Sequence, residues 1–200
     1  MRKFAPWIIL AVVVLIGYSW FKGIYNGAVS NNQNVKEAWG NVETSYQRRN
    51  DLIGNLVKTV KGAADFEKST LEAVIKARSE ATAVKIDPAN ITPEQLAQFN
   101  QAQGGLNSAL SRLLVTVEQY PDLKANQNFL KLQDELASTE NQILTARTRF
   151  NETVKVYNTG VTTFPNNIIT GMFGFKEMPY FDAVAGAEKP VEVEFDFDKK

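Results

Sequence analysis

The chain has 200 residues, and its 22 Lys and Arg balance its 22 Asp and Glu, so the formal net charge is zero. This balance argues against a nucleic-acid partner, because binding to phosphates requires an excess of basic side chains. The sequence has no Cys and no His, which excludes thiolate and imidazole metal ligands, catalytic pairs of Ser or Cys with His, and the His-containing di-iron sites of helical bundles.

The N-terminal segment from Phe4 to Phe21 carries no charged residue over 18 positions. As a helix it would measure about 27 Å, close to the hydrocarbon thickness of a bilayer. Trp7 and Trp20 lie toward its ends, where indole rings favour the membrane interface. We therefore predict a transmembrane anchor over residues 1–23, with residues 4–21 in contact with the lipid bilayer.

A cleaved secretory signal is the alternative interpretation of this segment. Such a signal has a shorter apolar core that is followed by small residues at the cleavage site, whereas residues 18–22 here read YSWFK. Arg2 and Lys3 precede the span, and only Lys22 follows it closely. The positive-inside rule therefore places the N-terminus in the cytoplasm and residues 22–200 outside it.

A long helix is predicted from residue 24 to about residue 61, where the sequence contains no Pro. Its apolar positions alternate by four and three, which is typical of a helix that packs against other helices. Arg49 is the single misfit in the series Val35, Trp39, Val42, Tyr46, Arg49, Ile53, Leu56 and Val60. Gly62 is the expected stop, and Asp65 is the expected N-cap of a shorter helix at about 66–84.

The third helix is predicted to begin at Thr92, because Thr is a good N-cap, Pro93 suits the first helical position and Gln95 completes a capping box. It should run to about Tyr120 with the same alternation of threes and fours, in which Gln103 is a polar member. A last long helix is expected over about 122–161, ended by Gly160 and Pro165.

Short connections between long helices imply antiparallel neighbours. The predicted fold is therefore all-α: a transmembrane helix, an antiparallel up-and-down bundle of long helices over residues 24–163, and a C-terminal tail over 164–200. Residues 164–175 should be irregular, and residues 191–198 alternate apolar and acidic side chains, which indicates a short strand. If the last helix returns to the membrane side, the first part of the tail meets the membrane or a partner through Phe164, Ile168, Ile169, Met172, Phe173 and Phe175.

Several segments of the sequence resemble the LemA family. Residues 47–57 read QRRNDLIGNLV, similar to the RRxDLIPNLV signature of that family, with Gly54 in place of the usual Pro. YPDLKAN at 120–126 and LQDEL at 132–136 also fit, as do Ala146-Arg147 through Phe150-Asn151, with Phe150 where Tyr is common. The resemblance implies a single-span protein of the bacterial cytoplasmic (inner) membrane, with no established enzymatic activity. Genes of the LemA family often lie near genes for membrane peptidases. The resemblance therefore suggests an envelope protein partner of that kind.

The polar residues in these segments are the candidate site. Arg49 falls on the apolar series of its helix, so we expect it to be buried and paired with a carboxylate such as Glu140. Two interpretations stay open: a buried polar network that fixes helix register, or a ligand site within the bundle. The candidate residues are Arg48, Arg49, Asp51, Asn55, Glu140, Asn141 and Arg147.

No catalytic, metal-binding or cofactor-binding residue is expected, and the chain is not expected to be an enzyme. The carboxylates Asp134, Glu135 and Glu140 share one helix, which is typical of a solvated face. The function predicted from the sequence is a structural or scaffolding protein of the bacterial envelope that associates with copies of itself. The alternative is a sensing or ligand-binding module that uses the Arg, Glu and Asn side chains of the candidate site.

Overall fold

The computed structural model describes residues 5–62 and 66–181, and every regular element in these ranges is a helix. The predicted all-α class is confirmed for this part of the chain, whereas the strand predicted over 191–198 lies outside it. The helices are α1 (Ala5–Lys61), α2 (Lys68–Ala83), α3 (Pro93–Val117), α4 (Pro121–Lys124), α5 (Gln127–Thr162) and α6 (Asn166–Met172).

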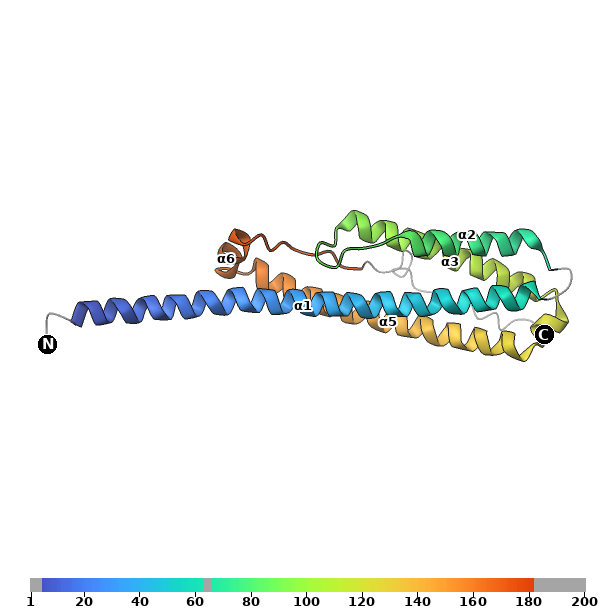
Figure 1. Cartoon of the computed structure of the whole chain (residues 1–200), viewed down its shortest axis with the longest axis horizontal. Coiled ribbons are helices and arrows are strands. Elements are labelled where there is room, and N and C mark those ends of the chain that lie inside the picture. Colours follow the sequence, from blue (N-terminus) through green and yellow to red (C-terminus); the bar gives the residue numbers. More distant parts are fainter. Residues whose placement is uncertain (1–4, 63–65, 182–200) are drawn as a thin grey trace, which may run out of the picture.

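Helix α1 is a single helix of 57 residues that crosses the predicted boundary at residue 23 without a break. Its first part extends beyond the rest of the molecule (Figure 1), and the large apolar side chains from Trp7 to Phe21 are exposed. An 18-residue window in α1 near the N-terminus has a mean hydropathy of 1.9, and this helix is long and apolar enough to cross a membrane. From Ala28 onward the same helix contributes buried residues to the core. The segment predicted to be the anchor is therefore continuous, within α1, with the first helix of the bundle.

Helices α1, α2, α3 and α5 lie along a common axis, and consecutive ones run in opposite directions (Figure 1). Two contacts between α1 and α5 agree with these directions. Arg49 contacts Glu140, whereas a Cβ at Gly160, later in α5, would contact Asn31, earlier in α1. Helices α1 and α5 are therefore antiparallel. Helix α2 packs against both α3 and α1. The end of α5 and all of α6 consequently lie on the side of the bundle from which the exposed part of α1 emerges.

The buried apolar residues form two separate clusters along this axis. The cluster nearer the predicted span, here called the membrane-side cluster, draws on residues 28–46, 86–99, 143–161 and 178–181, and includes Trp39. The distal cluster draws on residues 52–60, 71–81, 106–123 and 129–136. In the sequences of α1, α3 and α5, buried polar side chains lie between the residues of the two clusters: Arg49, Asn50, Gln103 and Thr139.

The capping box that was predicted at the start of α3 is confirmed. The backbone N–H of Gln95 donates to the Thr92 hydroxyl at 3.3 Å, and the N–H of Thr92 donates to the Gln95 side-chain oxygen at 3.1 Å. Pro93 occupies the first turn, where its missing N–H costs nothing.

The last long helix begins later than predicted. The prediction of one helix from about residue 122 is wrong, because the short α4 ends at Lys124 and the Asn126 side chain accepts hydrogen bonds from the N–H groups of Asn128 and Phe129. This cap starts α5 anew. Gly160 does not end α5, which continues to Thr162.

The first part of the tail is more regular than predicted. Residues 166–172 form helix α6 instead of an irregular segment, because the Thr170 hydroxyl donates to the carbonyl of Val161 at 2.9 Å and Ile169 is buried against the bundle. Gly174 then adopts a φ of +76°, a left-handed conformation that favours glycine, and the chain turns back along the bundle (Figure 1).

Candidate functional site

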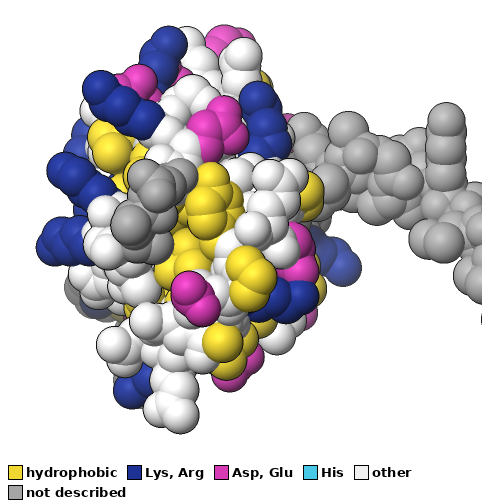
Figure 2. All heavy atoms as spheres, turned by 90° about the vertical axis from the view of Figure 1, so that its right-hand side faces the viewer, with side chains coloured by type: hydrophobic (Ala, Val, Ile, Leu, Met, Phe, Trp, Pro, Cys, Tyr) yellow, Lys and Arg dark blue, Asp and Glu magenta, His cyan; other side chains and the backbone are white. Residues whose placement is uncertain are grey.

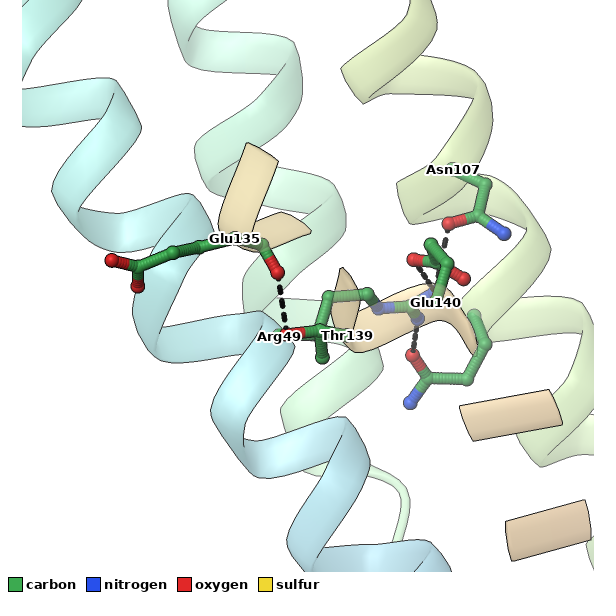
Figure 3. A network of polar contacts seen from close by, with 6 residues as sticks. Arg49, Asn107, Glu135, Thr139 and Glu140 are labelled. Atoms are coloured by element: carbon green, nitrogen blue, oxygen red, sulfur yellow. Dashed lines mark hydrogen bonds and ion pairs between the residues drawn. The ribbon is translucent and has the colours of Figure 1, made fainter. Parts of the chain in front are cut away.

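Two of the buried polar residues between the clusters, Arg49 and Gln103, join the exposed Asn107 and Glu140 in one network. Its centre is Arg49, whose side chain is 1% exposed. Its Nη1 donates to Asn107 Oδ1 at 2.8 Å and to Glu140 Oε1 at 3.1 Å, and its Nη2 donates to Gln103 Oε1. Figure 3 shows Arg49 reaching from α1 toward Asn107 on α3 and Glu140 on α5. We call Arg49, Gln103, Asn107 and Glu140 the polar layer.

The polar layer also contacts α2, because Gln103 Nε2 donates to the carbonyl of Ala81 at 3.4 Å. The nearby Thr139 satisfies its own hydroxyl within α5 by donating to the carbonyl of Glu135 at 2.8 Å (Figure 3). The layer thus links α1, α2, α3 and α5 at one level. Because Arg49 is buried while Glu140 is 45% exposed, the ion pair joins a buried guanidinium to a solvent-exposed carboxylate.

Tyr46 lies one turn before Arg49 and extends the layer toward the membrane side. The Arg49 guanidinium lies 4.9 Å from the centre of the Tyr46 ring. Burial raises the pKa of Tyr46 above 10.0, although the neighbouring guanidinium groups of Arg147 and Arg49, and a hydrogen bond from Arg147, act in the opposite direction. The phenol is therefore neutral in the folded protein near neutral pH.

The structure brings together three of the seven candidate residues: Arg49 and Glu140 bind each other directly, and Arg147 joins through Tyr46. The other four do not take part in this network. They lie on outward faces of their helices, since neighbouring positions in a helix point about 100° apart. These exposed residues are Arg48, Asp51, Asn55 and Asn141.

Gln103 and Asn107 also belong to the polar layer, although neither was among the residues predicted from the sequence. Gln103 has a signal in the sequence, because it is a polar residue within the apolar series of its helix, as Arg49 is in its own. Asn107 has no such signal, since it lies next to the apolar series on an exposed face.

A second polar arrangement holds residues 174–181, here called the strap, against α5. The Asn158 side chain donates to the carbonyl of Met178 at 2.8 Å and accepts from its N–H at 2.9 Å. Two turns earlier, Asn151 makes the same pair of bonds with Phe181, at 3.0 and 2.8 Å. A side-chain amide matches a peptide group in size and in its donor and acceptor, so each Asn binds the strap as a neighbouring backbone would.

The strap completes the membrane-side cluster. Its Phe181 ring stacks on Trp39 at 5.9 Å, meets Phe150 at 5.3 Å and lies 4.6 Å from the Arg147 guanidinium. Met178 and Phe181 of the tail are thus buried within the bundle, a contact that was not predicted from the sequence.

The apolar residues predicted to meet the membrane or a partner divide into two groups. Ile169 is buried and Phe175 is half-buried against the membrane-side cluster, so both pack inside the bundle, contrary to the contact predicted for them. The exposed group consists of Phe164, Ile168, Met172 and Phe173.

A groove of about 910 Å³ runs between α1 and α5. Asn34 and Asn41 of α1 line it together with Leu144 and Val156 of α5, two large apolar side chains that are 65% and 57% exposed. Over residues 5–62 and 66–181, no group of three His, Cys, Asp or Glu side chains could hold a metal ion.

The sequence profile of the LemA family matches residues 38–195 of this chain. Magnetosome protein MamQ 2 of Paramagnetospirillum magneticum is 29% identical over 200 aligned positions, which cover 92% of this chain and 73% of the relative. Magnetosome protein MamQ of Magnetospirillum gryphiswaldense is 29% identical, covering 84% and 68% of the two chains. Protein LemA of Metamycoplasma hominis is 24% identical, covering 92% of this chain and 80% of the relative.

Proposed function

The chain belongs to the LemA family, and we propose that it is a single-span membrane protein whose helical bundle is a structural platform for association with other copies and with envelope proteins. The observation that carries the proposal is the continuity of α1, which is exposed and apolar from Trp7 to Phe21 and enters a packed core from Ala28. Such a helix holds a folded domain at a fixed place beside a bilayer.

The proposed orientation has the N-terminus in the cytoplasm and the bundle outside it, in an up-and-down order that returns α5 to the membrane. Arg2 and Lys3 before the span, against Lys22 after it, support this orientation. Protease added to intact spheroplasts should digest the bundle. Resistance until the membrane is broken would contradict the orientation, and a mature N-terminus beyond residue 21 would contradict the anchor.

We place the contact between copies on the α1–α5 groove. Copies held in one bilayer in the same orientation meet side by side, so the contact must lie on a flank of the bundle and not on its distal end. Leu144 and Val156 offer exposed apolar area on this flank, and Asn34 and Asn41 offer hydrogen-bonding groups beside it. Mixed apolar and polar surfaces of this kind are typical of protein interfaces.

Cross-linking tests this contact, because a chain without Cys accepts single cysteines as unique probes. The full-length Leu144→Cys variant in membranes should form covalent dimers on mild oxidation. Val115→Cys is the matched control, since Val115 on α3 is 69% exposed and Leu144 is 65% exposed. Equal cross-linking of the two variants, or a monomeric mass for the detergent-solubilised protein, would overturn the proposed contact.

The ligand-binding alternative has less support from the geometry. Both terminal nitrogens of Arg49 already donate to Asn107, Glu140 and Gln103, and the guanidinium is closed off from solvent. The Nε of Arg49 is buried without a hydrogen-bond partner, but it is enclosed by the fold. A guanidinium held in this way is suited to fixing helix register, not to recognising a molecule from outside. We therefore assign the polar layer a structural role, and we propose that the protein acts by association and not by catalysis.

A further inference from the structure

A patch of exposed apolar side chains lies where the bundle meets the predicted span. Phe164 and Met172 are each 76% exposed, Ile168 is 57% exposed and Phe173 is 50% exposed. We call these four residues the collar. Helix α6 is held firmly behind them, because Ile169 and Thr170 are buried and the Thr170 hydroxyl binds the carbonyl of Val161.

The collar lies at the end of the apolar span of α1. The ring of Phe173 is 5.8 Å from that of Phe21, the last residue of the span, and 4.9 Å from that of Tyr25 one turn later. Helix α6 therefore lies beside α1 at the level where the predicted transmembrane segment ends. The exposed apolar surface of the collar continues that of the span.

The distribution of charge agrees with this position. From Val156 to Phe175 the sequence has 20 consecutive residues without a charge, and Lys155 and Lys176 flank them. At the opposite end of the bundle, charged side chains surround the central apolar ones (Figure 2). The two ends of the molecule thus suit different surroundings, and the long uncharged segment lies at the end beside the span, where Lys22 follows Phe21 directly.

We propose that the collar inserts into the boundary between headgroups and acyl chains of the same bilayer that α1 crosses, as a second and interfacial membrane contact. This inference rests on the proposed anchor. Aromatic and large aliphatic side chains favour that boundary, and flanking Lys residues can extend into the headgroup layer. Lipid is the occupant that the position favours, because the collar adjoins the span, whereas a second copy would have to fill a patch at the height of the bilayer surface.

A second contact would restrain the tilt of α1. A single transmembrane helix can tilt over a wide range, and the bundle would follow it because α1 has no break. Insertion of α6 on one side of α1 adds a fixed point away from the helix axis. The bundle would then stand over the bilayer in one preferred orientation, with the same flank available to each neighbouring copy.

Single labelled cysteines in the full-length protein test the proposal. Met172→Cys probes the collar, Ile16→Cys the span, and Leu144→Cys an equally exposed apolar position on the flank of the bundle. Each variant is labelled with an environment-sensitive fluorophore and reconstituted at low protein density into vesicles of phosphatidylcholine and phosphatidylglycerol. Quenching is measured with lipids that carry a nitroxide near the headgroup. Labels at 16 and 172 should be quenched at least several-fold more than the label at 144.

The three labelled positions distinguish a failure of the proposed collar from a failure of the proposed anchor. No quenching at 172 beside strong quenching at 16 would overturn the collar and leave the anchor in place. No quenching at 16 would overturn the anchor itself. A label at 172 that is shielded only at high protein density, and is not quenched by lipid, would identify a contact between copies and would equally overturn the collar. Unchanged helical circular dichroism of each variant confirms that the label has not disturbed the fold.

Discussion

The membrane-side and distal halves of the bundle are both packed around apolar helix faces, yet they are completed in different ways. The distal cluster is made by the helices and their connections alone. The membrane-side cluster also needs Met178 and Phe181, which arrive from the tail and are held by Asn158 and Asn151. The polar layer around Arg49 lies where one half gives way to the other. The membrane-side half therefore depends on the strap, which lies outside the helices.

Phe181→Ala should have the largest effect, because it empties the space between Trp39 and Phe150 in the membrane-side cluster. Replacing a buried Phe by Ala costs about 3–5 kcal/mol. Tyr180→Ala is the control, since Tyr180 is adjacent and exposed, and it should cost less than about 1 kcal/mol. Chemical unfolding of the full chain in detergent measures both. Similar midpoints for the two variants would show that the strap is not part of the core.

Arg49→Ala should come next, at about 2–4 kcal/mol, because it leaves the buried oxygen of Gln103 without a donor and opens a void. The loss is smaller than for a fully buried ion pair, since Glu140 can turn to water. Arg48→Ala should change stability by less than about 0.5 kcal/mol, because Arg48 is exposed. Arg49→Met fills the space without the charge and should lie between them. Equal stability of the Arg48 and Arg49 variants would refute the polar layer.

Asn158→Ala should cost about 1–3 kcal/mol, the usual penalty for leaving buried hydrogen-bonding groups unpaired. The affected groups are the N–H and the carbonyl of Met178. Asn151→Ala should cost less, because its bonds to Phe181 are only partly buried. Hydrogen exchange of the full chain locates the effect: protection should fall at residues 175–181 before it falls in the distal half. A uniform loss of protection would contradict a strap that can open by itself.

The smallest effect concerns alkaline pH. Burial raises the pKa of Tyr46 in the folded state above its unfolded value of 10.0. The folded state therefore favours the neutral phenol over the ionised one. The resulting contribution to the free energy of unfolding is fully present below pH 10 and is lost as the pH rises above it. Phe at position 46 cannot ionise, so the free energy of unfolding of the Tyr46→Phe variant should fall less than that of the native chain as the pH rises above 10.0. Parallel curves for the two proteins would show that the Tyr46 phenol is not the group responsible.

The polar layer was partly predictable because α1 has a regular period. Arg49 interrupts an otherwise apolar series, and a charge at such a position must be buried with a partner. The same reasoning could not find Asn107, whose position next to the series gives it an exposed face and no pattern. Which exposed polar residue reaches Arg49 depends on the rotation of α3 relative to α1, and a sequence period does not specify that rotation.

The strap was not predictable for a different reason. Its extended backbone has no helical or strand period, and its anchors Asn151 and Asn158 look like ordinary polar residues on a helix. Their role depends on a contact with residues 20 to 30 positions away. The late start of α5 has a local cause instead, since Asn126 in YPDLKAN is a good cap that was placed inside a helix.

If α1 runs without a break from the proposed anchor into the bundle, a distance measured across the membrane boundary should be that of one straight helix. Leu15 and Gln33 are exposed and lie 18 residues apart on α1, which is five turns of one helix face. Spin labels at Leu15→Cys and Gln33→Cys, in reconstituted full-length protein diluted with unlabelled protein, should give one narrow distance distribution near about 27 Å. A broad distribution, or a clearly shorter mean distance, would reveal a hinge between the span and the bundle and would contradict a continuous α1.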